Sequence, residues 1–433
     1  MKKIILFISI IIATLILSAQ EKENLGSTIN SKYRDINPIV SPDGKTLFFV
    51  RVNHPSNKYG KADSEDIWYS ELQDDETWSK AKLMPPSLNR IKYNSILSVT
   101  PDGNVFLIKG AFDYGKLVSK GFSLVYREKG GWSKPEKLDI RFYEDMDMGE
   151  YSGAFLSNNG QVLLMYFSEN ISNNICDIYF SILQKDGKWT KPKSLGKNIN
   201  GKKTDEVSPF LASDGKTLYF SSNRPGGVGA YDIYMSRRLD DSWKKWSEPK
   251  NLGQAINTSA WEAYYSIDAA GKYAYMVSTE NSLGLEDIIR IPLEKEAQPD
   301  PVVLISGKVI DSKTGKGISA KIFFEELGQE EPVGTARTNP DNGSFKIILP
   351  YGKHYSFSAN VDGYFPVSEN IDLMQVDEYK EILKNLKLVP IEVGHTVRLN
   401  NIFFDFGKAE LRPESFAELN KVVKLLNENP EME

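Results

Sequence analysis

Few residues of this 433-residue chain could support histidine- or cysteine-based chemistry. The three histidines, His54, His354 and His395, lie far apart in the sequence, and Cys176 is the only cysteine. A catalytic triad or a zinc site needs several such residues close together in space. The chain also contains no Gly-x-Ser-x-Gly, His-Glu-x-x-His or phosphate-loop motif. We therefore expect no catalytic site, no metal, no cofactor and no intrachain disulfide.

Carboxylates are the abundant reactive groups, because the chain has 58 aspartates and glutamates. A pair of carboxylates can hydrolyse a glycosidic bond, and the composition leaves such a pair open as an alternative. The aspartates with a recognisable pattern are Asp43, Asp102 and Asp214, each of which precedes a glycine. They recur once per sequence repeat, and a residue of that kind usually makes a hydrogen bond within its own repeat. We expect them to be structural, and the protein not to be an enzyme.

The phrase Pro-Asp-Gly-Lys-Thr-Leu-Phe-Phe at residues 42–49 opens the first of five copies of one unit. Its glycine recurs as Gly103, Gly160, Gly215 and Gly271, after steps of 59, 57, 55 and 56 residues. An Asp-Gly or Asn-Gly turn between β-rich runs is typical of a hairpin. Each unit continues with two more strand-like segments. Four strands per unit at a fixed period predict a mainly β chain that begins with a five-bladed β-propeller, with six blades as the alternative.

The repeat region begins with a short sequence that elsewhere follows a repeat unit, but here no repeat unit precedes it. Leu-Gly-Ser-Thr-Ile-Asn at residues 25–30 resembles residues 195–200 and 252–257, which follow the fourth strand of later units. The first and last blades of a ring must meet, and a segment that is offset in phase can join them. We expect residues 25–37 to close the ring in this way.

Two of these strings resemble a known repeat family. They are residues 42–49 and Ser-Ser-Asn-Arg-Pro-Gly-Gly-x-Gly-x-x-Asp-Ile-Tyr at residues 221–234. Both are similar to the WD40-like Pro-Asp propeller repeats of the periplasmic TolB protein and of Bacteroidetes envelope proteins. The resemblance covers residues 25–293 and implies a TolB-like propeller whose broad face binds an envelope protein partner.

A second domain is expected after a charged, proline-bearing linker at residues 294–302. Several short strand patterns within residues 303–390 predict a small β-sandwich. Residues 306–317, Gly-Ser-Phe at 343–345 and Gly-Tyr-Phe at 363–365 resemble the landmarks of carboxypeptidase-regulatory-like domains. That resemblance implies a non-catalytic domain.

Residues 396–433 resemble the first part of the OmpA-like C-terminal domain, through Phe-Phe-Asp-Phe-Gly-Lys-Ala-Glu-Leu-x-Pro-x-Ser at residues 403–415. We expect a strand that ends at Phe406 and then a helix. A capping box of Ser415 and Glu418 would begin that helix. Its spacing predicts one apolar face, made of Leu419, Val422, Val423 and Leu426.

In the OmpA-like family, an aspartate and an arginine of later motifs bind the diaminopimelate of peptidoglycan. Neither motif is present, so the resemblance implies that the peptidoglycan-binding residues lie beyond Glu433 and that this segment is incomplete. Gly-His-Thr at residues 394–396 resembles one of the motifs, but it precedes the strand instead of following it. We interpret it as a coincidence.

The first 19 residues are typical of a signal peptide, with Lys2-Lys3 before an apolar run of 14 residues, Ile4 to Leu17. Such a run is too short to span a membrane as a helix. We expect an exported periplasmic protein, associated with the outer membrane or cell wall, with no transmembrane segment in the mature chain. The net charge of −5 gives no reason to expect nucleic acid as a partner.

Together these features predict a non-enzymatic scaffold that links an envelope protein, bound by the propeller, to peptidoglycan, in a secretion or gliding machinery. A glycan- or small-ligand-binding propeller is the first alternative, and a propeller hydrolase is the second. Exposed aromatic residues in the variable loops, such as Tyr59, Tyr114 and Tyr231, would favour the first alternative, although aromatic residues there more often pack.

Overall fold

A computed structural model describes residues 22–329, 332–375, 377–392 and 399–430 of the chain. The signal peptide predicted at residues 1–19 and the Gly-His-Thr sequence at residues 394–396 lie outside these ranges. The described chain is mainly β and contains seven sheets. No helix in these ranges is long and apolar enough to cross a membrane.

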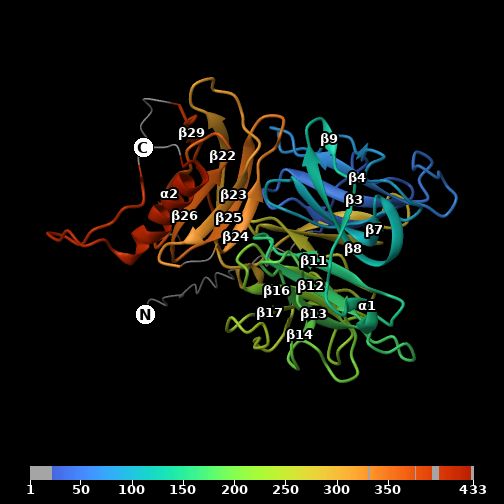
Figure 1. Ribbon diagram of the computed structural model, residues 1–433. Helices are drawn as coiled ribbons and strands as arrows, with labels where there is room; N and C mark the ends of the chain where they lie inside the picture. Colours follow the sequence, from blue (N-terminus) through green and yellow to red (C-terminus); the bar gives the residue numbers. More distant parts are fainter. Residues whose placement is uncertain (1–21, 330–331, 376, 393–398, 431–433) are drawn as a thin grey trace, which may run out of the picture.

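Five of the sheets come from residues 23–292 (Figure 1), and all five contribute residues to the wall of one cavity, an arrangement of the propeller type. We call them blades 1 to 5, and in each the strands pair antiparallel. Blade 1 contains β2 (Arg34–Val40), β3 (Thr46–Val52), β4 (Glu65–Glu71) and β5 (Lys82–Leu83). Blade 2 contains β6 (Ile96–Val99), β7 (Val105–Asp113), β8 (Lys116–Glu128), β10 (Glu136–Lys137) and, paired with β8, β9 (Gly131–Trp132).

The short helix α1 (Tyr143–Met146) leads into blade 3. Blade 3 contains β11 (Gly153–Leu156), β12 (Val162–Phe167), β13 (Asp177–Ile182) and β14 (Lys193–Ser194). Blade 4 contains β15 (Glu206–Leu211), β16 (Thr217–Ser222), β17 (Asp232–Arg237) and β18 (Lys250–Asn251). Blade 5 contains β19 (Ser266–Ile267), β20 (Tyr273–Ser278), β21 (Asp287–Pro292) and β1 (Glu23–Asn24).

The first and last blades are linked, because β1, which precedes blade 1 in the chain, is the outermost strand of blade 5. Leu47 and Phe49 of blade 1 share one buried apolar core with Tyr275 and Ile288 of blade 5. The predicted closing segment is therefore confirmed in kind, but it lies earlier than expected. It starts at β1, and residues 34–40 belong to the inner strand β2 of blade 1.

The repeated Leu-Gly-x-x-Ile-Asn phrase has a structural role in the blades. Asn200 accepts a hydrogen bond from the N–H of Ile178 (2.9 Å) and donates one to its carbonyl oxygen (2.8 Å). This amide therefore pairs with the exposed edge of the third strand as a neighbouring strand would. Asn89, Asn257 and Asn30 make the same two bonds to the third strands of blades 1, 4 and 5.

A two-layer β-sandwich follows blade 5 after the short helix η1 (Lys295–Ala297). One sheet contains β25 (Ser344–Pro350), β22 (Val302–Asp311), β28 (Lys380–Leu383) and β29 (Leu386–Leu388), and the last two pair parallel with β22. The other contains β24 (Gly334–Arg337), β23 (Lys321–Glu326), β26 (His354–Asn360) and β27 (Val367–Asp372). The apolar core between them includes Ile305, Phe324, Phe345 and Phe357.

The sandwich, orange in Figure 1, packs against the face of the propeller that carries the Asp-Gly turns. We call this the turn face. Asp43 of blade 1 forms an ion pair with Lys346 of the sandwich. The carboxylate of Asp102 in blade 2 accepts a hydrogen bond from the N–H of Arg337 (2.9 Å), and Asn159 of blade 3 donates one to Val333 (2.9 Å). The second domain is thus docked on the propeller instead of standing apart from it.

The turn aspartates also have the structural role that the sequence predicts. One oxygen of Asp102 accepts hydrogen bonds from Thr100 (2.6 Å) and Asn104 (2.8 Å) within its own turn. In blade 4, Asp214 binds Thr217 within the turn (2.6 Å) and also accepts a hydrogen bond from the N–H of Asp300 in the linker (2.9 Å). Each of these carboxylates therefore stabilises its turn with one set of contacts and holds the following segment with another.

Two predictions for the last segment are wrong. No strand ends at Phe406, because Phe404 makes only an isolated bridge with Leu411, and a strand needs a continuous neighbour for its N–H and C=O groups. The hydroxyl of Ser415 binds the backbone of Phe403 (2.8 and 3.2 Å), so the capping box with Glu418 does not form.

The predicted helix does form, as η2 (Pro413–Ser415) and α2 (Phe416–Glu428). It lies along the sandwich (Figure 1), and Lys421 binds Glu325 (3.1 Å) and Ser368 (3.0 Å) of that domain. Val423 and Leu426 of the predicted apolar face are exposed, whereas Leu419 and Val422 are partly buried.

Candidate functional site

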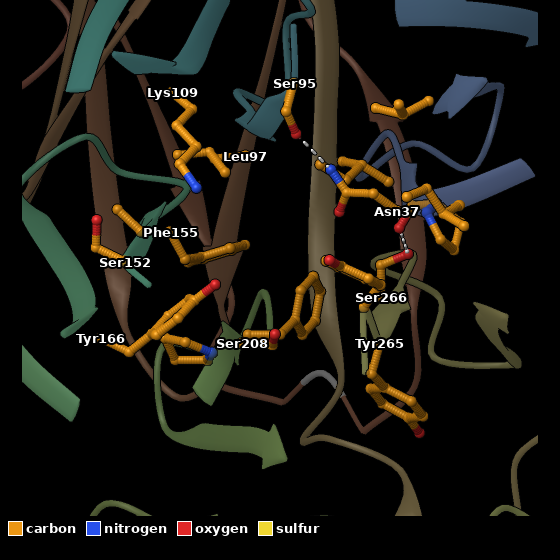
Figure 2. Close-up of a pocket in the computed structure, with 18 of the residues that line it drawn as sticks. Asn37, Ser95, Leu97, Lys109, Ser152, Phe155, Tyr166, Ser208, Tyr265 and Ser266 are labelled. Carbon is orange, nitrogen blue, oxygen red and sulfur yellow. Dashed lines mark hydrogen bonds between the residues drawn. The ribbon is translucent and has the colours of Figure 1, made fainter. Parts of the chain in front are cut away.

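The inner strands of the five blades enclose a cavity of about 170 Å³, which we call the channel (Figure 2). All five blades contribute to its wall. Phe155 and Phe210 supply aromatic surface, and residues such as Ile36, Val50 and Leu97 supply aliphatic surface. Most polar groups of the wall are neutral side chains that can donate or accept hydrogen bonds: Asn37, Ser95, Ser152, Tyr166, Ser208, Tyr264, Tyr265 and Ser266.

One carboxyl group and one amine complete this wall, those of Glu65 and Lys109. Burial raises the pKa of Glu65, although the nearby charge of Lys109 opposes the change. Burial likewise lowers the pKa of Lys109, against the opposing charge of Glu65. Neither head group has a hydrogen bond or an ion pair within the described residues. Figure 2 shows the Lys109 amine and the Tyr166 hydroxyl directed into the same space. Both charged groups can therefore bind a ligand.

The backbone of the channel wall is irregular at one repeated position. Asn37, Ser208 and Tyr264 occupy equivalent places in blades 1, 4 and 5, and their φ angles are 53°, 50° and 59°. Such left-handed angles are uncommon for residues other than glycine and costly for a bulky residue such as tyrosine. In blades 1 and 4 the strand register also shifts at this place. Bulges of this kind redirect side chains and are frequent beside functional sites.

The strained residues are held in place by contacts between blades. Asn37 donates hydrogen bonds to the hydroxyl of Ser95 (2.8 Å) and to the carbonyl oxygen of Ile96 (2.9 Å) in blade 2. Ser266 of blade 5 donates to the carbonyl oxygen of Pro38 (3.0 Å) in blade 1. The channel wall is therefore cross-linked before any ligand arrives, which favours binding by a preformed site.

The aromatic residues singled out in the sequence lie outside the channel. Tyr59 and Tyr114 are exposed in loops, Tyr114 at 89%. Tyr231 is partly buried, and its hydroxyl donates a hydrogen bond to Asp205 (2.5 Å). We expected aromatic residues in these loops to pack, as Tyr231 does, whereas Tyr59 and Tyr114 are exposed, the condition that would favour the ligand-binding alternative.

The histidines and the cysteine do not form a site. Burial lowers the pKa of His54 to about 4, and its ring packs edge-on against Tyr33 and Trp68. His354 lies on the sandwich, and His395 is outside the described residues. Burial raises the pKa of Cys176 to about 12, which leaves it an unreactive thiol. Within the described ranges, no three metal-binding side chains gather.

Sequence reasoning missed Glu65, Lys109 and Tyr264 because it looked for residues that repeat. A comparison of equivalent positions would have found the first two. Glu65 corresponds to Cys176 in blade 3 and to Tyr231 in blade 4, and Lys109 corresponds to Tyr166. The sequence signal for this site is therefore a change of residue type at a channel position between repeat units that are otherwise similar.

No family model and no curated protein sequence matches this chain. Solved structures are similar in fold. An α-L-arabinofuranosidase from Podospora anserina is 12% identical, with 63% of this chain and 96% of that chain covered and a TM-score of 0.40. A putative TolB from Agrobacterium tumefaciens is 14% identical, with 74% and 91% covered and a TM-score of 0.34. A structure described as a glycoside hydrolase is 10% identical, with 66% and 95% covered and a TM-score of 0.43.

At these identities the likeness concerns the fold alone, that of a mainly β chain of the propeller type. It agrees with the TolB-like propeller of the predicted resemblance. The OmpA-like and carboxypeptidase-regulatory-like resemblances stay predictions.

The expectation that this chain is not an enzyme is corrected by the same structures, because glycoside hydrolases are among them. That expectation rested on the scarcity of histidine and cysteine. Glycoside hydrolysis depends on carboxyl groups, so the scarcity of histidine and cysteine does not argue against it.

Proposed function

We propose that the five blades form one closed five-bladed β-propeller whose channel binds a neutral polar ligand of the carbohydrate class. The single observation that supports this proposal most is the composition of the channel wall. Eight neutral hydrogen-bonding side chains line it together with one carboxyl group and one amine, neither of which is paired.

A sugar suits this wall for chemical reasons. Each of its hydroxyl groups both donates and accepts hydrogen bonds, as the serine and tyrosine hydroxyls of the wall do. Glu65 can accept from one hydroxyl, and Lys109 can donate to another. The opposite charges of these two groups leave the wall without a net charge, so a neutral ligand fits better than an ion. Phe155 and Phe210 add apolar surface of the kind found in most ligand pockets.

The position of the docked sandwich indicates from which side a ligand would enter the channel. It covers the turn face through contacts with blades 1, 2 and 3, so the ligand would enter from the opposite face, where the loops between the second and third strands lie. We call this the loop face.

Calorimetric titration of the purified protein with a panel of neutral monosaccharides tests the proposal. Tyr166→Phe and Lys109→Met each remove one hydrogen-bonding group, and we expect each to weaken binding by about tenfold, or about 1.4 kcal/mol. Tyr114→Phe, in an exposed loop outside the channel, is the matched control and should bind as the wild type does. Failure of every sugar to bind, or equal affinities for all variants, would show that the proposal is wrong.

The same preparations should be assayed for sugar release from oligosaccharides, because the raised pKa of Glu65 would suit a general acid. Release that Glu65→Gln abolishes, while binding persists, would assign hydrolysis to this channel. Binding without release would assign recognition alone. The envelope partner, the peptidoglycan contact and the periplasmic location expected from the sequence stay predictions.

A further inference from the structure

A second cavity of about 1180 Å³ adjoins the channel at the loop face, beside blade 5 and β1. We call it the cleft. Its wall includes residues 254–264, which connect blades 4 and 5, and it shares Ile36 and Tyr264 with the channel wall. The two cavities therefore meet at Tyr264, the tyrosine that is held at a left-handed φ of 59°. The volume of the cleft is several times the volume of the channel.

Glu262 gives the cleft a polar group that lacks a partner. This side chain lines the cleft but is only 4% exposed. One carboxylate oxygen accepts a hydrogen bond from Thr258 (2.5 Å), and the other, Oε2, has no partner. The backbone of Glu262 is fixed by the N–H bond to Tyr231 (3.1 Å) and by a bond from Ser221 to its carbonyl oxygen (2.5 Å). Buried polar atoms are usually paired, so an oxygen fixed without a partner at a cavity wall indicates a missing donor.

Trp261, next to Glu262, offers a flat apolar surface at the rim of the same cleft. Its side chain is 59% exposed, which is unusual for the largest apolar residue. The indole is nevertheless held in place, because it packs edge-on against Tyr231 with ring centres 5.6 Å apart. Tyr231 is in turn fixed by its hydrogen bond to Asp205 (2.5 Å). A rigid, exposed tryptophan can pack on a ligand at little entropic cost.

The other charged groups of the cleft are already paired with each other. Arg34 binds Glu286 (2.8 Å), and Lys22 lies 3.7 Å from Glu280. Their charges cancel, so the cleft has no strong field that would select a charged ligand. Burial raises the pKa of Glu262, and the nearby charge of Asp232 acts in the same direction.

We propose that the cleft is an extension of the channel site and that the ligand is a neutral oligosaccharide, one unit of which lies in the channel while the next units lie along Trp261 and bind Glu262. This inference rests on the proposed function of the channel and names the length of its ligand. A hydroxyl group would donate to Oε2 of Glu262, and a sugar ring would pack on the indole.

The test compares ligands of one to six sugar units, from cello- and arabino-oligosaccharide series, by calorimetric titration of the full chain. For the wild type we expect the affinity to rise at least tenfold between one unit and three or more units. Trp261→Ala and Glu262→Gln should remove most of this gain and leave the affinity for one unit unchanged. Tyr114→Ala, another exposed aromatic residue outside the cleft, is the matched control and should keep the full gain.

The outcomes separate the two proposals. If single sugars bind but affinity does not depend on length, or if Trp261→Ala and Glu262→Gln keep the gain, the cleft inference is wrong and the channel proposal stands. If neither single sugars nor oligosaccharides bind the wild type, both are wrong. Tighter binding of an amino-sugar oligomer such as chitosan than of the neutral series would also overturn the inference, because the partner of Glu262 would then be a cation.

Discussion

The two faces of the propeller use the same repeat in opposite ways. On the turn face, similar residues recur from blade to blade, and Asp43, Asp102 and Asp214 all serve their own turns while they hold the segments that follow. On the loop face, equivalent positions differ, as Glu65 and Tyr231 do. The unpaired polar groups and the strained tyrosine lie on this side.

The difference teaches which part of a repeat protein to search for function. A residue that must occur once in every blade satisfies a requirement that every blade shares, such as closing a turn or packing on the next sheet. A residue that breaks the pattern is released from that requirement. The contrast can be measured on two tryptophans, on two buried contacts of different types, and on one carboxylate that stands at a different position of its turn.

The largest expected effect is a difference in stability between two variants, one that replaces a tryptophan of the repeat and one that replaces a tryptophan outside it. Trp189 precedes the last strand of blade 3 and is 2% exposed, so Trp189→Ala should lower the free energy of unfolding by about 3–5 kcal/mol. Trp261→Ala, which truncates the exposed indole of the cleft, should change it by about 0.5 kcal/mol or less. Denaturant unfolding of both variants measures the difference. A cost below about 1 kcal/mol for Trp189→Ala would contradict the structural role of the repeat.

A repeated asparagine should produce the next largest effect. Asn30 is buried, makes two hydrogen bonds to the backbone of Ile288 in β21 of blade 5, and donates a third to Asn24. Asn30→Ala would leave a buried N–H and a buried carbonyl group unpaired, and we expect a loss of about 2–4 kcal/mol. Thermal and denaturant unfolding measure it against Asn173→Ala, a change in an exposed loop that should have little effect. Equal stability of the two variants would show that the closing segment contributes nothing.

The sequence predicted the repeated part of this molecule well and the rest poorly. The hairpin turns, the period and the closing phrase follow from local residue types, and local rules suffice for them. The docking of Lys346 on Asp43 could not be predicted, because it joins residues 303 positions apart in the chain. The capping box failed for a similar reason, since the Ser415 hydroxyl found a better partner in the backbone of Phe403. The channel was missed because its wall takes residues from five blades, and none of them forms a motif.

A smaller effect tests the contact between the turn face and the sandwich. Although burial of Asp43 acts to raise its pKa, the ammonium group of Lys346 outweighs it and holds the pKa below its usual value. A lowered carboxylate pKa adds stability above the unfolded value near 4, and this stability is lost as the pH falls through the folded pKa. We expect Lys346→Met to cost about 1 kcal/mol at pH 7 and much less at pH 3.

Denaturant unfolding at the two pH values measures this dependence. Lys202→Met removes an exposed lysine of a propeller loop and is the matched control. A cost for Lys346→Met that is independent of pH would mean that the lysine contributes through packing instead of charge.

The smallest effect concerns the turn of blade 5, which departs from the repeat. In blade 5 the position of the turn aspartate is taken by Ala270, and a carboxylate stands two residues earlier, at Asp268, where blades 1 and 2 have Ser41 and Thr100. Burial raises the pKa of Asp268 to about 6, in spite of hydrogen bonds from the backbone that include one from the N–H of Gly271 (2.8 Å).

The folded protein therefore holds the proton of Asp268 more tightly than the unfolded chain does. The contribution of this group to stability is fully present below pH 4 and is lost as the pH rises through about 6, the opposite sign to that of Asp43. Asp268→Asn keeps an oxygen that can accept from Gly271 and removes the charge, so it should stabilise the protein at pH 7 and make no difference at pH 4. Unfolding of the wild type and of this variant between pH 4 and pH 7.5 measures the change. If Asp268→Asn were destabilising at pH 7, the charge of Asp268 would be needed, and the turn of blade 5 would resemble that of blade 1.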